Sequence, residues 1–341
     1  MNSSTEAKKK LAEMAIPSGS LGLLGRQAVK LFTAWQSTPE QLRPLHLIFA
    51  ADNGIIEEGV VRQSQDITYR QAQNMAAGKA VISVFCQTNN IPYQVIDVGI
   101  NNDLSVGINR KTAKGTKNFL KEPAMTREEY QQAFASGQEM VSRAKDCNLI
   151  SLGEMGIGNT TTSSAVLHGL TQIAPEFIVG CGANAQYPEV IKRKREVVAA
   201  AGNIYGRLFT DPAEIIRCVG GFDIAAMCGA MLACKQKNIP FVLDGFITAA
   251  AFACAVRMDP SISDYGFASH MSREPGMAYA LHLGGIEEAE VPIRADLALG
   301  EGSGAVLAVT MLRSVIAAIC QVPKMSELTE PQDLSHISRE A

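Results

Sequence analysis

The sequence predicts an α/β fold with a parallel sheet, and the order of its segments is the first reason. Short apolar runs typical of buried strands alternate along the chain with longer runs of helical periodicity. Several of the apolar runs also end in glycine beside a polar residue, as strands of a parallel sheet do where they lead into ligand-binding loops. This pattern favours right-handed βαβ units. We expect one large α/β domain over residues 45–319, and a small helical domain formed by residues 1–44 together with 320–341.

The expected strands are apolar runs that are too short for helices. They cover residues 45–50, 93–100, 148–152, 177–179, 215–219 and 241–243. The expected helices lie between them, over residues 66–89, 126–146, 163–170, 224–235 and 247–257, and another follows at 305–319. Thr126 and Glu129 have the spacing of a capping box, which marks the start of one of these helices.

Composition excludes several classes of protein. Hydrophobic residues make up 47% of the chain, charged residues 19% and aromatic residues 6%, which is typical of a globular enzyme. The net charge is −3 and the basic residues are scattered, so we expect no nucleic-acid partner. The eight cysteines form no C-x-x-C pair, which indicates reduced thiols rather than a disulfide framework or a zinc site.

The sequence also indicates a cytoplasmic protein with no membrane partner. Residues 1–10 are polar and charged, and they lack the apolar core of a signal peptide. The longest apolar run, residues 241–256, is interrupted by Asp244 and falls short of the roughly 18 residues that a membrane span requires.

Residues 299–304 place one carboxylate, Glu301, among three glycines just before an apolar helical run. Glycine on both sides of an acid lets a ligand approach the backbone closely. Ser303 is a suitable N-cap, and free N–H groups at a helix start would hold Glu301 ionised, which suits a base or a ligand anchor. A simple helix-capping role is the alternative, and these six residues taken alone favour it.

Two glycine-rich segments are candidates for phosphate binding. Residues 153–162 connect an expected strand to an expected helix, and residues 180–184 repeat the arrangement, with Lys194 on the helix that follows. Such turns expose N–H groups at a helix N-terminus, where anions bind. The spacing matches neither the P-loop nor G-x-G-x-x-G, and tight packing of a helix on the sheet would explain either segment alone.

Other acids and one histidine occupy similar positions, and each has a structural alternative. Asp52, Asp223 and Asp244 follow expected strands, where an acid serves a turn or a helix cap as readily as a ligand. His270 is a possible catalytic group, although a hydrogen-bonded structural histidine is the more common finding.

Taken together, these segments resemble one family, the nicotinate-nucleotide:dimethylbenzimidazole phosphoribosyltransferases of cobalamin lower-ligand assembly. The resemblance extends over about residues 15–325. The matching segments are residues 17–22, 51–54, 58–60, 153–161, 180–184, 220–223, 243–246, 269–270 and 299–304.

The resemblance implies transfer of ribose 5-phosphate from nicotinate mononucleotide to an aromatic base, which gives an α-ribotide and nicotinate for cobamide synthesis. It implies a Rossmann-like parallel sheet with helices on both faces, and a dimer that uses no metal or organic cofactor. Glu301 matches the general base of the family, which takes the proton of the acceptor. The dinucleotide oxidoreductases are the rival enzyme class, and the missing G-x-G-x-x-G counts against them.

The other site residues follow from the same matches. Glu154 would act beside Glu301 by orienting the ribose or the donor, and Asp223 and Asp244 are weaker candidates for positioning. The residues expected to bind the donor and its phosphate are Gly156, Asn159, Thr160, Gly182, Ala183, Asn184, Lys194, Ser269 and Gly302. Those expected to bind the acceptor are Gln63, Gln71, Met155 and Leu299.

The chain departs from the family pattern beside the acceptor. Asn53 stands where members usually have histidine, and Gln63 and Ser64 replace a Ser-Pro pair, whereas Gln71 is kept. The larger amide of Gln63 leads to the hypothesis that the acceptor is another benzimidazole, a purine or a phenol such as p-cresol.

The phenol-activating relatives include enzymes built from paired unlike subunits, so both a homodimer and a heterodimer with a paralogue are open. The alternative function is a catalytically weak or regulatory subunit of such a pair. Retention of Glu301, Glu154 and Lys194 argues against it.

Overall fold

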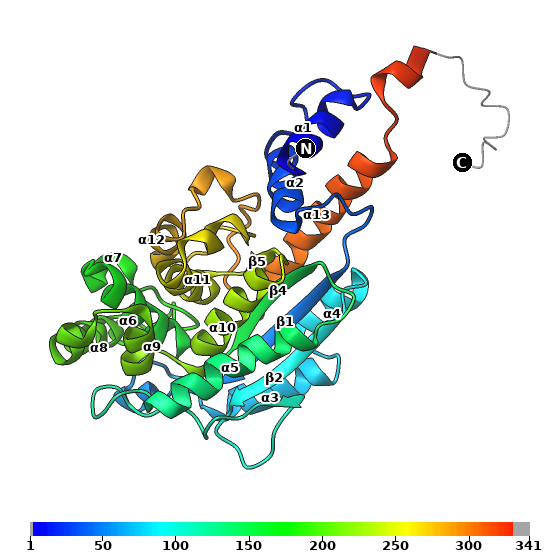
Figure 1. Ribbon diagram of the computed structural model, residues 1–341. Coiled ribbons are helices and arrows are strands. Elements are labelled where there is room, and N and C mark those ends of the chain that lie inside the picture. The colour runs from blue at the N-terminus through cyan, green and yellow to red at the C-terminus, as the bar shows by residue number, and fades with distance from the viewer. Residues whose placement is uncertain (1–2, 330–341) are drawn as a thin grey trace.

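A six-stranded parallel sheet lies at the centre of the fold (Figure 1). The structure is a computed structural model, and it describes residues 3–329. The strands are β1 (Pro44–Ala51), β2 (Tyr93–Gly99), β3 (Ile108–Asn109), β4 (Leu149–Met155), β5 (Phe241–Leu243) and β6 (Gly266–Ala268), and their order in the sheet is β3-β2-β1-β4-β5-β6. Every pairing is parallel. This is the doubly wound order, which confirms the predicted α/β class and the Rossmann-like sheet.

Helices cover both faces of the sheet. One face carries α5 (Arg127–Arg143), α6 (Asn159–Thr171), α7 (Pro175–Ile178), α8 (Pro188–Tyr205), α9 (Pro212–Val219), α10 (Phe222–Gln236), α11 (Phe246–Met258) and α12 (Gly276–Leu283). The other carries α1 (Ser3–Glu13), α2 (Gly22–Trp35), α3 (Asp66–Ala76), α4 (Val81–Thr88) and α13 (Ser303–Gln321). Short 3₁₀ helices lie at Gly54–Glu58, Gly206–Leu208, Pro260–Asp264, Glu288–Glu290 and Met325–Thr329.

The sequence of β1 explains the two layers. Leu47, Phe49 and Ala51 pack into the core on the α10 side, whereas Ile48 and Ala50 pack into the core on the α13 side. Side chains of a strand alternate between the faces, so a strand with apolar residues on both faces must be covered on both. β1 lies between β2 and β4. From β1 the chain adds β2 and β3 on one side, and it then returns to add β4, β5 and β6 on the other side. The carboxyl ends of β1 and β4 therefore border the crevice where ligands bind in folds of this type.

Two of the expected strands are wrong. Residues 177–179 fall in α7 and the loop after it, and residues 215–219 form the end of α9. Proline is the first residue of both helices, a position that it favours because its missing N–H is not needed there. The side chain of Asp211 also caps α9 by accepting from the N–H of Glu214 at 3.0 Å. Short apolar runs do not by themselves distinguish a strand from a helix.

Other boundaries differ in smaller ways. The helix expected over residues 66–89 is two helices, α3 and α4, which are separated by Gly78 in the left-handed region at φ 74°. β3 and β6 have two and three residues, too few to give an apolar pattern. The capping box of α5 is confirmed, because Thr126 Oγ1 accepts from Glu129 N–H at 3.1 Å and Glu129 Oε2 accepts from Thr126 N–H at 2.7 Å.

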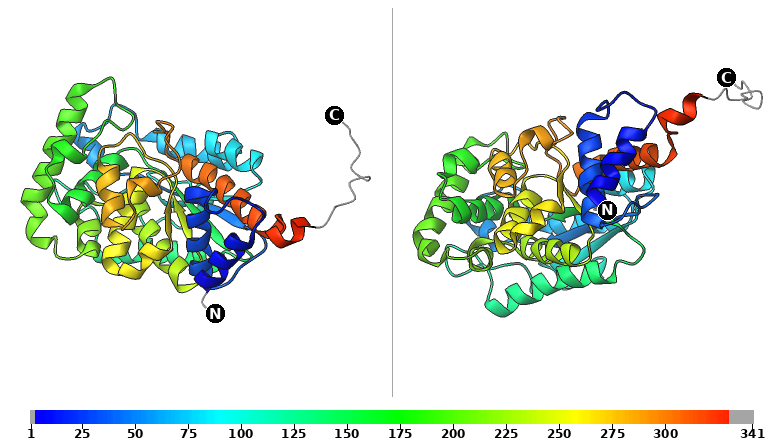
Figure 2. Two further views of the ribbon diagram at one scale, coloured as in Figure 1. Left: turned by 90° about the horizontal axis from the view of Figure 1, so that it is seen from above. Right: turned by 45° about the horizontal axis from the view of Figure 1, so that its top comes forward.

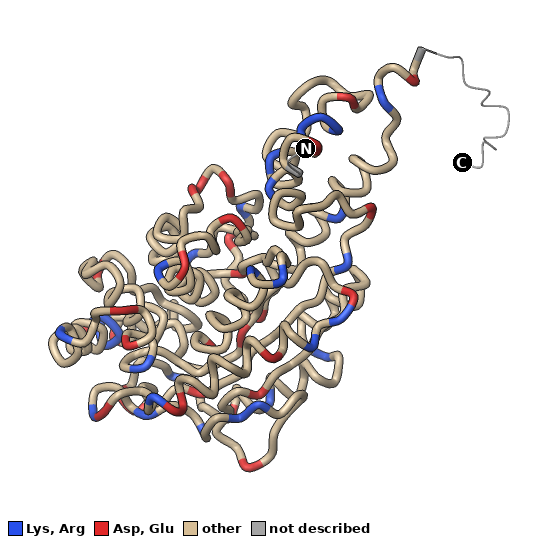
Figure 3. Tube along the Cα trace, viewed as in Figure 1, with Lys and Arg blue, Asp and Glu red and all other residues tan. Residues whose placement is uncertain are grey.

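The two terminal segments lie side by side, as Figure 2 shows for α1, α2 and α13. Ala15 N–H donates to Pro323 O at 2.9 Å. The division into two domains stays a prediction, and residues 1–2 and 330–341 of the smaller one lie outside the described residues. α13 is long and apolar enough to cross a membrane, but 56% of its most apolar 18-residue stretch is buried inside the protein. In the view of Figure 3, basic and acidic residues are interspersed along the chain.

We predict that Gly137→Ala destabilises the protein by about 1–3 kcal/mol, the usual cost of overpacking. α5 and α10 cross so closely that a methyl group on Gly137 would overlap the carbonyl oxygen of Ala226. Gly206→Ala is the matched control, because its φ is −53° and a methyl group there meets no neighbouring atom within 4 Å. Urea denaturation of the two variants measures the difference. Equal stability of both would contradict the close crossing.

Candidate active site

A cavity of about 310 Å³ lies at the carboxyl ends of the central strands. Its wall is formed by residues from six segments of the chain. They come from residues 60–71, 154–160, 182–194, 244–248, 270–274 and 298–301. The segments that the sequence marks as glycine-rich therefore meet at one place, although they are up to about half the chain apart.

The Glu301 loop has an unusual backbone. Gly300, Glu301 and Gly302 are all in the left-handed region, with φ of 78°, 66° and 91°. This conformation costs a residue with a side chain roughly 1–2 kcal/mol, so the surroundings must hold Glu301 there. His46 does so in part, because its Nε2–H donates to the Glu301 carbonyl at 3.1 Å while Nδ1 accepts from the Ser151 hydroxyl at 2.8 Å. Burial lowers the pKa of His46 and keeps the ring neutral for these two roles.

Asp244 at the end of β5 holds the other side of the loop. Its Oδ2 accepts from Gly302 N–H at 3.1 Å, and its Oδ1 accepts from Gly304 N–H at 2.8 Å and from Ala305 N–H at 3.2 Å. These are the free N–H groups at the start of α13, so Asp244 caps a helix far from it in sequence. The expected cap at Ser303 is wrong. Its hydroxyl lies in the first turn, buried and without a partner among the described residues.

The Glu301 side chain is buried beside the cavity. Gln71 Nε2 donates to Oε1 at 2.6 Å, while Oε2 has no hydrogen-bond partner among the described residues. Burial raises the pKa of Glu301, whereas the bond from Gln71 and the backbone N–H of Ile82, in the first turn of α4, oppose the rise, and Asp244 adds to it last. The N–H groups at the start of α13, which were expected to favour the ionised form of Glu301, are bonded to Asp244 instead. A carboxylate with a raised pKa and a free oxygen is a stronger general base.

Glu154, near the end of β4, takes part in a second buried cluster. Asn159 Nδ2 donates to Glu154 Oε2 and also to Asp223 Oδ2, the latter at 3.2 Å. Burial raises the pKa of Glu154 to about 8, and the charge of Asp223 contributes. Burial also raises the pKa of Asp223, to about 6, but the N–H of Ile224 bonds its Oδ1 at 2.9 Å and opposes the shift.

The opposite end of the cavity offers positive charge and donors. Lys194 Nζ is buried and donates to Thr160 Oγ1 at 2.7 Å. Burial lowers the pKa of Lys194 and the nearby carboxylate of Glu274 counteracts this. Glu274 Oε1 also accepts from Gly182 N–H at 2.7 Å. The start of α6 also lies at the cavity, through Asn159 and Thr160, and the positive end of the helix dipole there suits a phosphate.

A set of contacts between residues 62–63 and 183–189 joins the two sides of the cavity. Arg62 N–H donates to Asn184 Oδ1 at 3.2 Å, and Gln63 Nε2 donates to Ala183 O at 3.2 Å. The Arg62 guanidinium pairs with Glu189 at 2.7 Å. Gln63 therefore contacts the loop on the phosphate side and is not part of the cavity wall.

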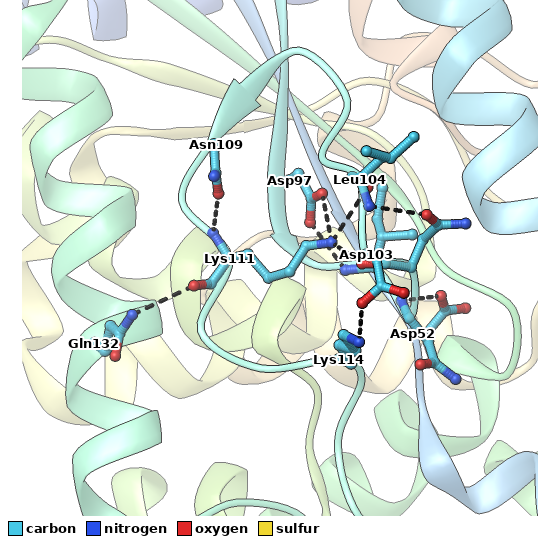
Figure 4. A network of polar contacts seen from close by, with 11 residues as sticks. Asp52, Asp97, Asp103, Leu104, Asn109, Lys111, Lys114 and Gln132 are labelled. Carbon is cyan, nitrogen blue, oxygen red and sulfur yellow. Dashed lines mark hydrogen bonds and ion pairs between the residues drawn. The ribbon is translucent and has the colours of Figure 1, made fainter.

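Asn53 and Asp52 lie behind the cavity, where the chain leaves β1. Asn53 Nδ2 donates to Ile157 O at 3.3 Å, and its Oδ1 is buried without a partner among the described residues. Asp52 Oδ2 accepts from Asn101 N–H at 2.8 Å in the network of Figure 4. There Lys111 pairs with Asp97 at 3.2 Å and ties down the loop that follows β2. These contacts favour the structural interpretation of Asp52.

Most of the predicted site residues line the cavity. They are Glu154, Gly156, Asn159, Thr160, Gly182, Ala183, Asn184, Lys194 and Glu301, with Gln71, Met155 and Leu299 of the expected acceptor group. Gln63, Ser269 and Gly302 do not line it. Ser269 is behind the wall, where its hydroxyl donates to Asp244 O at 3.1 Å.

Sequence reasoning gave no role to several wall residues. Glu274 is one, and its partner Gly182 is 92 residues away, so no local pattern could reveal it. Val60, Val61 and Ile67 are others, and their apolar side chains cannot be told from core residues in a sequence. Within residues 3–329 no group of three or more His, Cys, Asp or Glu side chains is placed to hold a metal ion.

Comparisons with known proteins show which family the chain is similar to. A family model described as phosphoribosyltransferase (DBI_PRT) matches residues 1–328. The nicotinate-nucleotide–dimethylbenzimidazole phosphoribosyltransferase of Clostridium perfringens is 38% identical over 314 residues, which are 90% of this chain and 85% of the relative. That of Janthinobacterium sp. (strain Marseille) is 36% identical over 307 residues, which are 88% of this chain and 87% of the relative. The crystal structure of CobT from Thermus thermophilus superposes with a TM-score of 0.89 at 34% identity, over 97% of this chain and 99% of that chain.

We predict that Asp244→Ala lowers the free energy of unfolding by about 2 kcal/mol or more, because three N–H groups lose a charged acceptor. Asp244→Asn is the matched variant and should cost less, since its amide oxygen can still accept from Gly304 and Ala305. Urea denaturation measures both. An Asp244→Ala protein as stable as the wild type would show that the cap does not hold the loop.

We predict that Glu154 makes stability fall as pH rises. Its pKa is about 8 in the folded protein against an ordinary value of 4.5. Its contribution is therefore fully present below about pH 4.5 and is lost as pH rises through 8, with a slope of up to about 1.4 kcal/mol per pH unit. In Glu154→Gln this decline should be absent. The exposed Glu176→Gln serves as control, and a Glu154→Gln protein with the wild-type pH dependence would contradict the assignment.

Proposed function

Because the chain belongs to the nicotinate-nucleotide–dimethylbenzimidazole phosphoribosyltransferase family, we propose that it transfers ribose 5-phosphate from nicotinate mononucleotide to an aromatic acceptor and releases nicotinate. One observation carries the proposal. Glu301, with a free carboxylate oxygen, and the Lys194–Thr160 pair line the same cavity. A base and an anion site in one cavity are what this transfer needs, since the donor already carries a good leaving group.

The cavity supports a definite orientation of the substrates. The 5′-phosphate binds to Lys194 and Thr160, and the ribose extends toward Glu301. The acceptor nitrogen attacks C1′ with its electron pair while the bond from C1′ to the pyridinium nitrogen breaks, and that electron pair neutralises the nicotinate ring. Glu301 takes the N–H proton of the acceptor. Attack opposite to the leaving group converts a β-linked donor into an α-linked product.

The apolar residues of the cavity wall bear on the choice of acceptor. They are Val60, Val61, Ile67, Met155 and Leu299. A benzimidazole or a phenol such as p-cresol loses little on entering such a wall. A purine would bury additional ring nitrogens and exocyclic groups without partners, which is costly. We therefore rank benzimidazoles and phenols above purines.

The hypothesis that Gln63 selects the acceptor has less support. The amide of Gln63 donates to Ala183 O, on the phosphate side, and does not line the cavity. Any effect of Gln63 on the acceptor would be indirect, through the loop that binds the donor. The contacts from residues 62–63 would then link the position of one substrate to that of the other.

We also propose that the enzyme works as a dimer of two copies. Ile67, Val81 and Val84 on α3 and α4 are large apolar side chains with exposed fractions of 39%, 44% and 48%. Neighbouring exposed apolar residues favour an interface. An autonomous enzyme is favoured over a regulatory paralogous subunit, because Glu301, Glu154 and Lys194 line one cavity together.

The direct test incubates the purified chain alone with nicotinate mononucleotide and a panel of benzimidazoles, purines and phenols. We expect nicotinate release and an α-ribotide with at least one benzimidazole or phenol, detected by chromatography and mass spectrometry. Absence of nicotinate release with every acceptor would refute an autonomous transferase. Activity with purines alone would overturn the ranking of acceptors.

The base assignment is tested with Glu301→Gln, which keeps the shape and can still hydrogen-bond Gln71. We expect its kcat to fall by about 10²–10⁴-fold, the usual contribution of a general base. Its thermal unfolding should stay close to that of the wild type, which would exclude misfolding as the cause. Turnover near the wild-type value would rule out Glu301 as the base.

A further inference from the structure

The cavity holds more acidic groups than one general base requires. Glu154 lines it together with Glu301 and Asp244, and Asp223 lies just behind. The charges that act on Glu154 are those of Asp223, Asp244 and Glu301, all of one sign. Glu154 is 6% exposed. A fully ionised set of acids in such a space would repel both one another and an anionic substrate.

The bonds of Asn159 distinguish the two oxygens of Glu154. The amide nitrogen of Asn159 has two hydrogens, and it donates one to Glu154 Oε2 and one to Asp223 Oδ2. Oε2 is thereby fixed as an acceptor. Oε1 points toward the Glu301 loop, where a methyl group on Gly300 would be 2.8 Å from it. If Glu154 carries a proton, the proton is therefore on Oε1, at the cavity.

The surroundings also decide which of the two acids keeps the charge. Asp223 is in the first turn of α10, and its Oδ1 accepts from Ile224 N–H. A helix N-terminus and a backbone donor stabilise an ionised carboxylate. Glu154 is at the end of a strand, and Asn159 is its hydrogen-bond donor. The charge therefore belongs on Asp223 and the proton on Glu154.

We propose that Glu154 acts as a neutral hydrogen-bond donor, and that its Oε1–H binds an oxygen of the donor nucleotide while Asn159 and ionised Asp223 hold its other oxygen. The proposal rests on the function proposed above and adds the protonation state of Glu154. Glu154 contacts the substrate, and Asn159 and Asp223 are positioning residues. Glu301 then remains the base, with a neutral group rather than a second anion beside its loop.

The proposal implies a limit to activity at high pH. The pKa of Glu154, about 8, is set by burial first and by Asp223 second. Above this pH, Glu154 becomes an anion and can no longer donate its hydrogen bond to the substrate. Two further titratable groups lie on or just after β1, the strand that pairs with β4, and both have other partners. His46 is neutral and bonds to Ser151 and to the Glu301 carbonyl, and Asp52 accepts from Asn101 N–H. Removal of the charge of Asp223 should move the limit to lower pH.

The kinetic test compares kcat/KM against pH for the wild type, Glu154→Gln, Glu154→Ala and Asp223→Asn. The glutamine amide can donate at Oε1's position, so Glu154→Gln should stay within about tenfold of the wild type at pH 7 and lose the decline above pH 8. Glu154→Ala should lose about 10²–10³-fold, as when one donor to a reacting group is removed. Asp223→Asn should show the decline at lower pH. A Glu154→Gln enzyme as impaired as Glu154→Ala would overturn the proposal, since it would mean that the ionised form is required.

A second measurement needs no activity. The infrared spectrum of the ligand-free wild type minus that of Glu154→Gln should contain the carbonyl band of a protonated carboxyl group at pH 7, and this band should vanish above about pH 9. Protonation of other acids cancels in the difference. No such band at pH 7 would overturn the proposal. If the chain proves inactive with every acceptor, the proposed function fails, but the spectrum still decides the state of Glu154.

Discussion

The bonds from Asp244 to the backbone at the start of α13 are the constraint on which the rest of the site depends. The Glu301 loop needs three successive residues in the left-handed region, and one of them has a side chain. Asp244 and His46 hold this loop from opposite sides. The same bonds remove the helix N–H groups from Glu301 and place a second negative charge near it. Burial therefore raises the pKa of Glu301, the proposed base, and the donors that oppose this rise are Gln71 and the N–H of Ile82 rather than the start of α13.

Much of the fold could be predicted from the sequence because its central strands are short and mostly apolar. β1, β2 and β4 are buried over most of their length and carry aliphatic residues on both faces, although polar residues interrupt each of them. Residues 177–179 and 215–219 are equally apolar but follow a proline at a helix start, and proline outweighs the apolar run. β3 and β6 exist only because neighbouring strands pair with them. Pairing between distant segments cannot be read from a local pattern.

In the site, too, a local pattern could reveal some features, whereas others depend on contacts between distant segments. Glu301, Glu154 and Lys194 could be predicted to lie together because acids and glycines at strand ends, together with a family resemblance, indicate them. The partners that set their chemistry could not. Asp244 acts on residues 58 or more positions away, Asn159 bridges to Asp223 across 64 residues, and Glu274 reaches Gly182 across 92. Gln63 was expected at the acceptor and instead bonds to Ala183, because the direction of a side chain in a loop depends on the other loop.

The two glutamates of the cavity, Glu301 and Glu154, have the same chemical group but different proposed roles. Both are buried, so neither can be understood from its ordinary pKa. Glu301 has one oxygen bonded by Gln71 and the other free, which suits a group that must accept a proton. One oxygen of Glu154 accepts from the amide of Asn159, and the same amide also donates to Asp223, which is stabilised by a helix N-terminus. This arrangement suits a carboxyl group that must keep its proton. Neighbouring acids in different environments titrate apart, and that separation lets a cavity without an obvious acid–base pair perform both roles.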